Sequence, residues 1–438
     1  MSVFTVARAR TVARLTLAAT MLVGGAAMSP AAHAGRAADK VTITYWNGWT
    51  DPVSKTGFKK VIAAFEKAYP NITVNMVDLA SDTKLLTAIS GGQPPDAATL
   101  MNDRNLGAWA ARGALQNLDG LAKTYHTNLA DYTSAALALS TYRGHLYALI
   151  PEVDPTSLLI NTDAFKAAGI TKYPQTMSEL AADALKLTQK DSSGRITQMG
   201  LVTGYNSDPL GFTFPIFNVP WYDAQHNKMM IDTPEAMQAV TWEKNLVDKI
   251  GVQAYENFRA SKAKNAMGDH FIDGTAAMDF DGDWACNLVP AYMTKKFNWV
   301  AVAPPYADGH PEWKNSTWVD GSVNVIPTGS GHPNEAYQFI NFINTADANV
   351  LLNQYVGGKS PLKSGLAIQH QRGNACSRLF DTLLQGPRAF TWPTLKFSYD
   401  LNTGVSNTED AILRGSVSPK AGLAKLQQQM QAKLDSGQ

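Results

Sequence analysis

The sequence predicts an α/β protein whose sheets are mainly parallel and flanked by helices. At about 100–200 residues per domain, the 438 residues provide for two domains, or three. Segments rich in β-branched residues alternate with segments of helical periodicity, which is typical of strand–helix–strand units. Hydrophobic residues make up 45% and charged residues 17%, which excludes a mostly disordered chain. The net charge of +1 excludes a strongly basic nucleic-acid binder.

The first forty residues have the order of a secretory signal peptide. Arginines up to Arg14 precede an apolar stretch over residues 15–28, and the small-residue pattern Ala32-His33-Ala34 stands before Gly35. The apolar stretch is too short for a comfortable bilayer span, although a short membrane anchor is the alternative. No cysteine lies near the cut to carry a lipid. We therefore expect residues 1–34 to be removed, and the soluble product to be exported, with the periplasm as the best-fitting compartment.

Strands and helices alternate directly after this leader. Strands are predicted at Val41–Tyr45, Ile72–Leu79 and Ala97–Met101 because β-branched and other apolar residues dominate these segments. Helices are predicted between them at Gly57–Tyr69 and Lys84–Ser90. A β-α-β-α-β order argues for a parallel sheet with helices on both faces.

Helix starts are recognisable farther along the chain. Thr176 with Glu179 forms a predicted capping box, and Thr233 and Ser418 are predicted N-caps that are each followed by proline. Pro333 opens a further predicted helix. No segment after the leader has 18 uninterrupted apolar residues, so no transmembrane helix is expected.

Signatures of catalysis and of metal binding are missing from the sequence. It contains no G-x-S-x-G, H-E-x-x-H, Walker or G-x-G-x-x-G pattern, and its eight histidines are scattered. We therefore expect no enzyme, no metal and no cofactor. The two cysteines, Cys286 and Cys376, exclude a disulfide framework and a multi-cysteine zinc module. Either a disulfide between them or two separate buried thiols is compatible with the sequence.

Aromatic and polar residues gather where the first predicted strands end. Trp46, Asn47 and Asp51 follow the first strand, and Asp103 and Arg104 follow the third. Ligands of open α/β sheets bind outside the carboxyl ends of the strands, which makes both places candidate sites. The alternatives are that Trp46 continues the strand into the core, and that the acid and base form an ordinary surface pair.

Two further groups of the same kind occur later. Trp284 ends the run Asp281-Gly-Asp-Trp284 after a β-like segment, and Glu152 and Asp154 lie between prolines at a predicted crossover. Flat aromatic faces pack on pyranose rings, while carboxylates, Asn and Arg bind their hydroxyls. Together these residue types predict a sugar site.

The order of these motifs resembles family 1 extracellular solute-binding proteins, the periplasmic carbohydrate receptors of ABC importers. The resemblance spans nearly the whole chain after the leader. The motifs that carry it are Asn71-Ile-Thr-Val74, Gly91-Gly92-x-Pro-Pro-Asp96, Asp103-Arg104, Gly113-x-Leu115, Tyr142-Arg-Gly-His-Leu-Tyr-Ala148, Ile150-Pro-Glu152, Leu159-Ile-Asn-Thr-Asp163, Gly274-Thr-Ala-Ala-Met278, Gly282-Asp-Trp284, Glu335-Ala-x-x-Phe339-Ile340 and Gly358-x-x-Pro361.

The resemblance implies a two-lobed periplasmic binding protein fold, type II-like, with hinge crossovers between the lobes. The N-terminal lobe would hold residues 35–150 with a return segment 321–375, and the C-terminal lobe 151–320 completed by 376–438. The implied ligand contacts, some from the resemblance and some from the residue types above, are Trp46, Asn47, Asp51, Asp103, Arg104, Glu152, Tyr205, Trp221, Trp284 and Trp392.

The implied function is capture of a mono- or oligosaccharide between the lobes and its delivery, by hinge closure, to an ABC permease with its ATPase. The protein is expected to be a monomer with no nucleic-acid partner. One alternative is a binding protein for a phosphorylated polyol, such as glycerol 3-phosphate, or for a polyamine. A remote alternative is a secreted glycoside hydrolase that uses Glu152 and Asp103.

Overall fold

The computed structural model describes residues 40–202, 209–265 and 267–437. The predicted signal peptide and Tyr205 lie outside these residues. Within the described ranges, no helix combines the length and the apolar character needed to cross a membrane.

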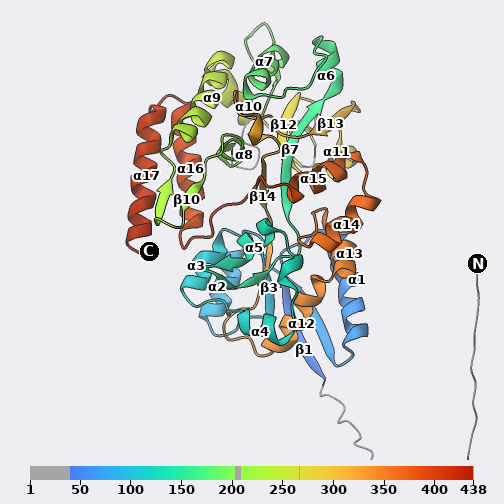
Figure 1. Cartoon of the computed structure of the whole chain (residues 1–438). Helices are drawn as coiled ribbons and strands as arrows, with labels where there is room; N and C mark the ends of the chain where they lie inside the picture. Colours follow the sequence, from blue (N-terminus) through green and yellow to red (C-terminus); the bar gives the residue numbers. More distant parts are fainter. Residues whose placement is uncertain (1–39, 203–208, 266, 438) are drawn as a thin grey trace, which may run out of the picture. The chain divides into compact units, whose positions relative to one another are not determined.

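The first sheet has five strands in the order β2-β1-β3-β15-β6. Its members are β1 (Val41–Asn47), β2 (Ile72–Asp78), β3 (Ala97–Leu100), β6 (Ala148–Leu149) and β15 (Val323–Val325). β1 pairs parallel with β2 and β3, as the β-α-β-α-β pattern predicts, whereas β15 is antiparallel to β3 and β6. A late segment of the chain therefore returns to complete the first sheet (Figure 1).

Helices and short elements surround this sheet. They are α1 (Pro52–Ala68), α2 (Asp82–Ser90), α3 (Asn105–Ala111), α4 (Asp119–Thr124), η1 (Leu129–Asp131), α5 (Ser134–Ser140), α12 (Pro333–Ile343), α13 (Ala346–Val356) and α14 (Lys363–Arg372), with a small ribbon of β4 (Thr141–Tyr142) and β5 (His145–Leu146). α1 buries Phe58, Val61, Ile62 and Phe65, the same apolar stripe that predicted the helix.

The second sheet is built around β7 (Asp154–Asn161). β7 pairs antiparallel with β12 (Met278–Gly282), β13 (Trp299–Val302) and β14 (Thr317–Asp320), whereas β14 and β16 (Ala389–Phe390) pair in parallel. The α/β class is confirmed, but this sheet differs from the predicted mainly parallel arrangement. The reason is that the central strand β7 runs opposite to all three of its neighbours.

Helices and ribbons around the second sheet come from the rest of the chain. They are α6 (Thr162–Ala167), α7 (Met177–Leu187), α8 (Pro209–Ile216), α9 (Pro234–Ile250), α10 (Val252–Arg259), α11 (Ala285–Tyr292), η3 (Pro311–Trp313), α15 (Ala375–Gln385), α16 (Ser398–Leu413) and α17 (Pro419–Asp435), with the ribbons β8 (Gln189–Lys190)–β9 (Ile196–Gln198) and β10 (Trp221–Asp223)–β11 (Lys228–Met230). The predicted capping box at Thr176 and the N-caps at Thr233 and Ser418 are confirmed.

Each sheet has its own hydrophobic core. The first core draws on residues from Ile43 to Val153 and again on a return segment that begins at Val319. The second core draws on residues from Leu158 to Trp318 and on a final segment from Phe380 to Met430. The chain crosses between the two cores at β7, at β14 and after α14 (Figure 1). The exact lobe boundaries stay a prediction.

Candidate functional site

Three carboxyl groups lie together where the chain crosses between the two cores. Asp154 opens β7, Glu152 stands two residues before it, and Asp283 follows β12 directly. Glu152 and Asp283 are buried, whereas Asp154 retains partial exposure. The side chains of Glu152 and Asp283 both interact with that of Asp154. We call Glu152, Asp154 and Asp283 the carboxyl triad.

Burial and the charges of neighbouring carboxyl groups favour the protonated forms of the triad residues. Burial raises the pKa of Glu152, and burial together with the charges of Glu152 and Asp283 raises the pKa of Asp154 well above its ordinary value. Burial also raises the pKa of Asp283, although the charge of Lys359 opposes the rise. At least one member of the triad is therefore protonated where isolated carboxyl groups would be ionised.

The backbone around the triad leaves no room for additional side chains. The Ser322 backbone N–H donates to Glu152 Oε1 at 2.8 Å, and the Ser322 hydroxyl donates to the same oxygen. A Cβ atom on Gly358 would lie 2.9 Å from the Glu152 Cβ and 3.1 Å from Asp154 Oδ1. Glycine at position 358 is thus required by the close approach of the backbone to the triad.

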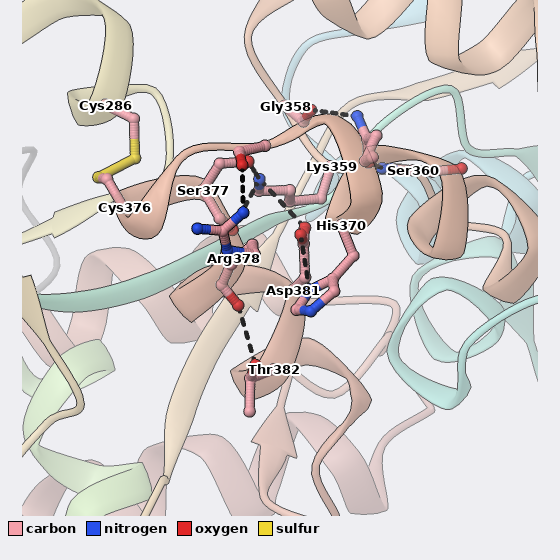
Figure 2. A network of polar contacts seen from close by, with 12 residues as sticks. Cys286, Gly358, Lys359, Ser360, His370, Cys376, Ser377, Arg378, Asp381 and Thr382 are labelled. Carbon is pink, nitrogen blue, oxygen red and sulfur yellow. Dashed lines mark hydrogen bonds and ion pairs between the residues drawn. A yellow bond between two sulfur atoms is a disulfide. The ribbon is translucent and has the colours of Figure 1, made fainter.

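Lys359 acts electrostatically on the triad residue Asp283, and its own charge is balanced by Asp381. Its Nζ lies 3.1 Å from Asp381 Oδ1 and donates to the Ser377 carbonyl at 3.1 Å (Figure 2). His370 Nδ1 lies 3.4 Å from the second oxygen of Asp381. Figure 2 also shows the disulfide between Cys286 and Cys376, which joins the first turns of α11 and α15. This disulfide settles the alternative that the sequence leaves open.

Arg104 links the end of the first sheet to the second core. Its Nη2 lies 3.9 Å from Asp320 Oδ2, and its guanidinium carbon lies 5.4 Å from the centre of a Trp392 ring. Asp320 pairs with Asp154 across the β14–β7 ladder. Asp103, which precedes Arg104 in the sequence, is buried. The structure therefore brings together two predicted site residues, Arg104 and Trp392, and places Arg104 near Asp320, which lies opposite the triad residue Asp154.

Trp221 and Trp392 form the centre of an aromatic cluster. Their ring centroids are 4.3 Å apart, Phe214 lies 4.5 Å from Trp221, and Trp318 lies 5.3 Å from Trp392. Both tryptophans are 2% exposed, which makes them part of the second core. Within the described residues, neither indole nitrogen has a hydrogen-bond partner. Trp392 is thus a buried support under Arg104, and Trp221 packs behind it.

Trp284 lies directly before α11, next to the triad residue Asp283. Its side chain is half-buried and folds back over Gly282, where an added Cβ would lie 2.2 Å from the ring. Its side chain also hydrogen-bonds to the buried Asp281. Position 282 therefore has to be glycine for the indole to keep this orientation.

The residues predicted in the loop after the first strand are placed differently. β1 extends to Asn47, so Trp46 and Asn47 belong to the strand rather than to a loop. The buried Asn47 side chain donates to the Trp49 carbonyl at 2.7 Å. Trp46 is half-buried, with Lys84 Nζ 5.5 Å from its ring centre. The strand runs on because Trp46 and Asn47 pair with Val77 and Asp78 of β2.

Asp51 is the N-cap of α1, a role that explains its identity without a ligand. Its carboxylate accepts from the backbone N–H of Val53 at 2.9 Å and of Ser54 at 3.0 Å.

We expect Asp51→Ala to lower the free energy of unfolding by about 1 kcal/mol, because two helix N–H groups lose their acceptor. Urea unfolding measures the change. Asp51→Ser keeps a capping oxygen and is the control; equal losses in both variants would contradict the capping role.

A cavity of about 680 Å³ opens at the carboxyl ends of β1, β2 and β3. Its lining includes Gly48, Met101 and Asn102 from the first sheet's side, and Tyr399 from α16, whose neighbours belong to the second core. Met101 is 45% and Tyr399 53% exposed, which is unusual for large apolar side chains. This cavity lies at the sheet edge where the sequence predicts a site, and Tyr399 is an addition to it, because a tyrosine inside a helix carries no signal of a site.

The chain matches the model of the bacterial extracellular solute-binding protein family over residues 49–350. This match covers more than half of the chain, so the protein belongs to that family, and it is a solute-binding protein of the extracellular type. The family resemblance predicted from the sequence motifs is confirmed.

Relatives of known name support the same assignment. An uncharacterized ABC transporter extracellular-binding protein, PH1214 of Pyrococcus horikoshii, is 25% identical over 338 residues, which are 75% of this chain and 73% of that protein.

Solved structures resemble the chain in fold. CpMnBP1 with mannotriose bound is 24% identical with a TM-score of 0.76, covering 89% of this chain and 99% of that one. The sugar-binding protein MalE from Xanthomonas citri is 18% identical with a TM-score of 0.74, covering 90% and 98%. UgpB from Mycobacterium tuberculosis in complex with glycerophosphocholine is 20% identical with a TM-score of 0.72, also covering 90% and 98%. The two-lobed architecture is therefore the fold of this protein.

Proposed function

We propose that the protein captures a mono- or oligosaccharide between its lobes and delivers it to an ABC permease with its ATPase. The observation that carries the proposal is the meeting of Arg104, Asp320 and Trp392 at the crossing between the two cores. The guanidinium and the carboxylate can bind sugar hydroxyls, and the buried Trp392 ring supports the guanidinium from beneath. Residues 1–34 would act as the signal peptide for export to the periplasm, where the protein works as a monomer without a lipid anchor.

The named relatives support this substrate class. Structural neighbours are described with mannotriose bound or as a sugar-binding protein, and the Pyrococcus relative is described as an ABC transporter component. In such a mechanism the solute binds the closed arrangement of the lobes better than the open one, and so shifts the population toward closure. The candidate contacts would be residues of the 680 Å³ cavity, among them Met101 and Tyr399, together with Arg104 and Trp284.

The charges at the crossing favour a sugar over a phosphorylated polyol. Arg104 faces Asp320, and Lys359 faces Asp381, so each of these cations already has a carboxylate beside it. The carboxyl triad adds acidic groups that would repel a phosphate. UgpB in complex with glycerophosphocholine shares the fold, so phosphorylated solutes are included in the experiment below. A hydrolase that uses Glu152 and Asp103 is not favoured. Glu152 is buried and accepts a hydrogen bond from Ser322, and the family consists of binding proteins.

Thermal melting of the chain from Gly35 onward against a set of solutes tests the proposal. The set contains manno- and malto-oligosaccharides, monosaccharides, glycerol 3-phosphate, glycerophosphocholine and spermidine. A solute at a hundred times its Kd stabilises the folded state by about 2.7 kcal/mol, which raises the melting temperature by several degrees. We expect a rise with one class of sugar. A rise with only the phosphates or only the polyamine would overturn the sugar assignment.

Trp284→Ala is expected to weaken sugar binding at least tenfold while leaving the fold intact, because it removes a half-buried aromatic face without emptying the core. Gly282→Ala keeps the indole but displaces it, and should weaken binding in the same direction. Isothermal titration with the sugar found above measures both. Trp313→Ala is the matched control, since Trp313 stacks on His310 at 3.8 Å, away from these residues. Unchanged affinity in Trp284→Ala would remove this residue from the site.

A further inference from the structure

Helix α3 of the first core lies against a short segment of the second core. α3 packs its apolar side chains into the first core, and its third residue is the buried Gly107. The segment that faces it, residues 393–398, buries Leu395 and Phe397 in the second core and ends at the first residue of α16. We call residues 393–398 the strap. The chain crosses between the cores elsewhere, so α3 and the strap can separate without a break in either core.

The backbones of α3 and the strap approach each other more closely than a side chain would allow. A Cβ atom added to Gly107 would lie 2.3 Å from the Leu395 carbonyl oxygen and 2.7 Å from the carbonyl carbon. Only glycine therefore permits this contact. Three residues earlier, Arg104 at the start of α3 lies over Trp392, which is three residues before Leu395. One turn of α3 thus follows the second core from Trp392 to Leu395.

A hydrogen bond joins the same two cores beside this contact. The Thr394 hydroxyl of the strap donates to the Ala138 carbonyl of α5 at 3.0 Å. α5 is fixed in the first core by Ala136 and Leu139. The strap therefore contacts two helices of the first core.

The strap is held in shape by its own hydrogen bonds. The Leu395 backbone N–H donates to the Ser398 hydroxyl oxygen at 2.7 Å, and this hydroxyl donates to the Pro393 carbonyl at 2.7 Å. Ser398 is buried, which keeps water from competing for these bonds. A segment that is already ordered loses little conformational entropy when it meets α3.

The contact lies at the edge of the candidate solute cavity without being part of it. Trp109 and Arg112 of α3 line the 680 Å³ cavity, and so does Tyr399, the residue directly after the strap. Gly107 and the strap residues are not among the residues that line it. The contact can therefore hold the two lobes together around a solute that it does not touch.

We infer that Gly107 and the strap form a closing contact between the lobes, which sets the affinity for every solute by the same factor. This inference rests on the proposed capture of a solute between the lobes, and it adds Gly107 as a positioning residue. The contact stabilises the closed arrangement whether or not a solute is present. The apparent Kd equals the intrinsic Kd divided by the fraction of binding-competent molecules, so a larger closed fraction tightens the binding of all solutes alike.

Gly107→Ala tests the inference, and Gly120→Ala is the matched control. Gly120 also lies in a short helix, α4, but a Cβ atom added there has open space around it. In small-angle X-ray scattering without solute, we expect a larger radius of gyration for Gly107→Ala than for the wild type and the control, because the methyl group pushes the strap away from α3. Isothermal titration with mannobiose and mannotriose, or with two sugars that the melting experiment selects, should show an affinity loss of about tenfold, equal for both sugars.

Melting without solute separates a closing contact from permanent packing. Lobes that can open avoid the clash, and alanine is a better helix former than glycine, so Gly107→Ala should melt close to the wild-type temperature. In a permanent interface the same methyl group would be overpacked, and a lower melting temperature with an unchanged radius of gyration would overturn the inference. An unchanged affinity, or unequal losses for the two sugars, would overturn it as well.

Thr394→Val is a second test, which introduces no clash. It removes the hydrogen bond to Ala138 and keeps the size of the side chain, so the affinity should fall by about threefold for both sugars. Thr124→Val is its control and should bind as the wild type does, since the Thr124 hydroxyl donates to the Gly120 carbonyl at 2.9 Å within α4. Wild-type affinity in Thr394→Val would contradict the role of the strap in closure. If no sugar binds, the proposed function fails, and scattering and melting still decide the closing contact.

Discussion

Breaking the disulfide between Cys286 and Cys376 is expected to lower the free energy of unfolding by about 4 kcal/mol. The two cysteines are 90 residues apart in the sequence, so the bond removes a large loop-closure entropy from the unfolded chain. The bond also ties α11 to α15, and α11 begins directly after Trp284. We therefore expect the reduced protein to melt at a markedly lower temperature and to bind its solute more weakly.

Melting with and without reductant, together with the double variant Cys286→Ser/Cys376→Ser, measures this effect. The double variant should match the reduced wild type and should no longer respond to reductant, which separates the disulfide from other actions of the reagent. A wild type that melts at the same temperature in both conditions would show that the crosslink contributes nothing to stability.

The fold class and the first sheet could be predicted because their signals are local. Helical periodicity in α1 and the alternation of strand and helix up to β3 depend on residues that are near one another in the sequence. The direction of β7 relative to its three neighbours could not be predicted, because strand pairing between distant segments leaves no pattern in any one of them. For the same reason the sequence predicted mainly parallel sheets.

The candidate site shows the same limit. Arg104 and Glu152 were chosen because they follow or precede strands, and the structure places both near the crossing between the cores. The contact of Asp283 with Asp154 joins segments far apart in the sequence, so only the structure reveals the carboxyl triad. Trp221 was a candidate contact from the C-terminal lobe, but it lies in the core, because the sequence does not distinguish a buried aromatic residue from one that lines a site.

Trp392→Ala is expected to have the other large effect, a loss of about 3–5 kcal/mol in the free energy of unfolding. The side chain is 2% exposed and packs against Trp221 and Trp318, so its removal leaves a cavity in the second core. It also removes the ring beneath Arg104, which should let the guanidinium leave Asp320 and weaken sugar binding. Urea unfolding and isothermal titration measure the two effects.

A second variant separates packing from recognition at this position. Trp392→Phe keeps an aromatic ring under Arg104 while reducing the volume, so it should recover a large part of the stability and of the affinity. Trp313→Ala, in the half-buried stack with His310, is the control for the loss of a tryptophan elsewhere in the same core region and should cost less. If Trp392→Ala lost stability but bound the sugar as tightly as the wild type, Trp392 would serve only the core, and Arg104 would hold its position without this ring.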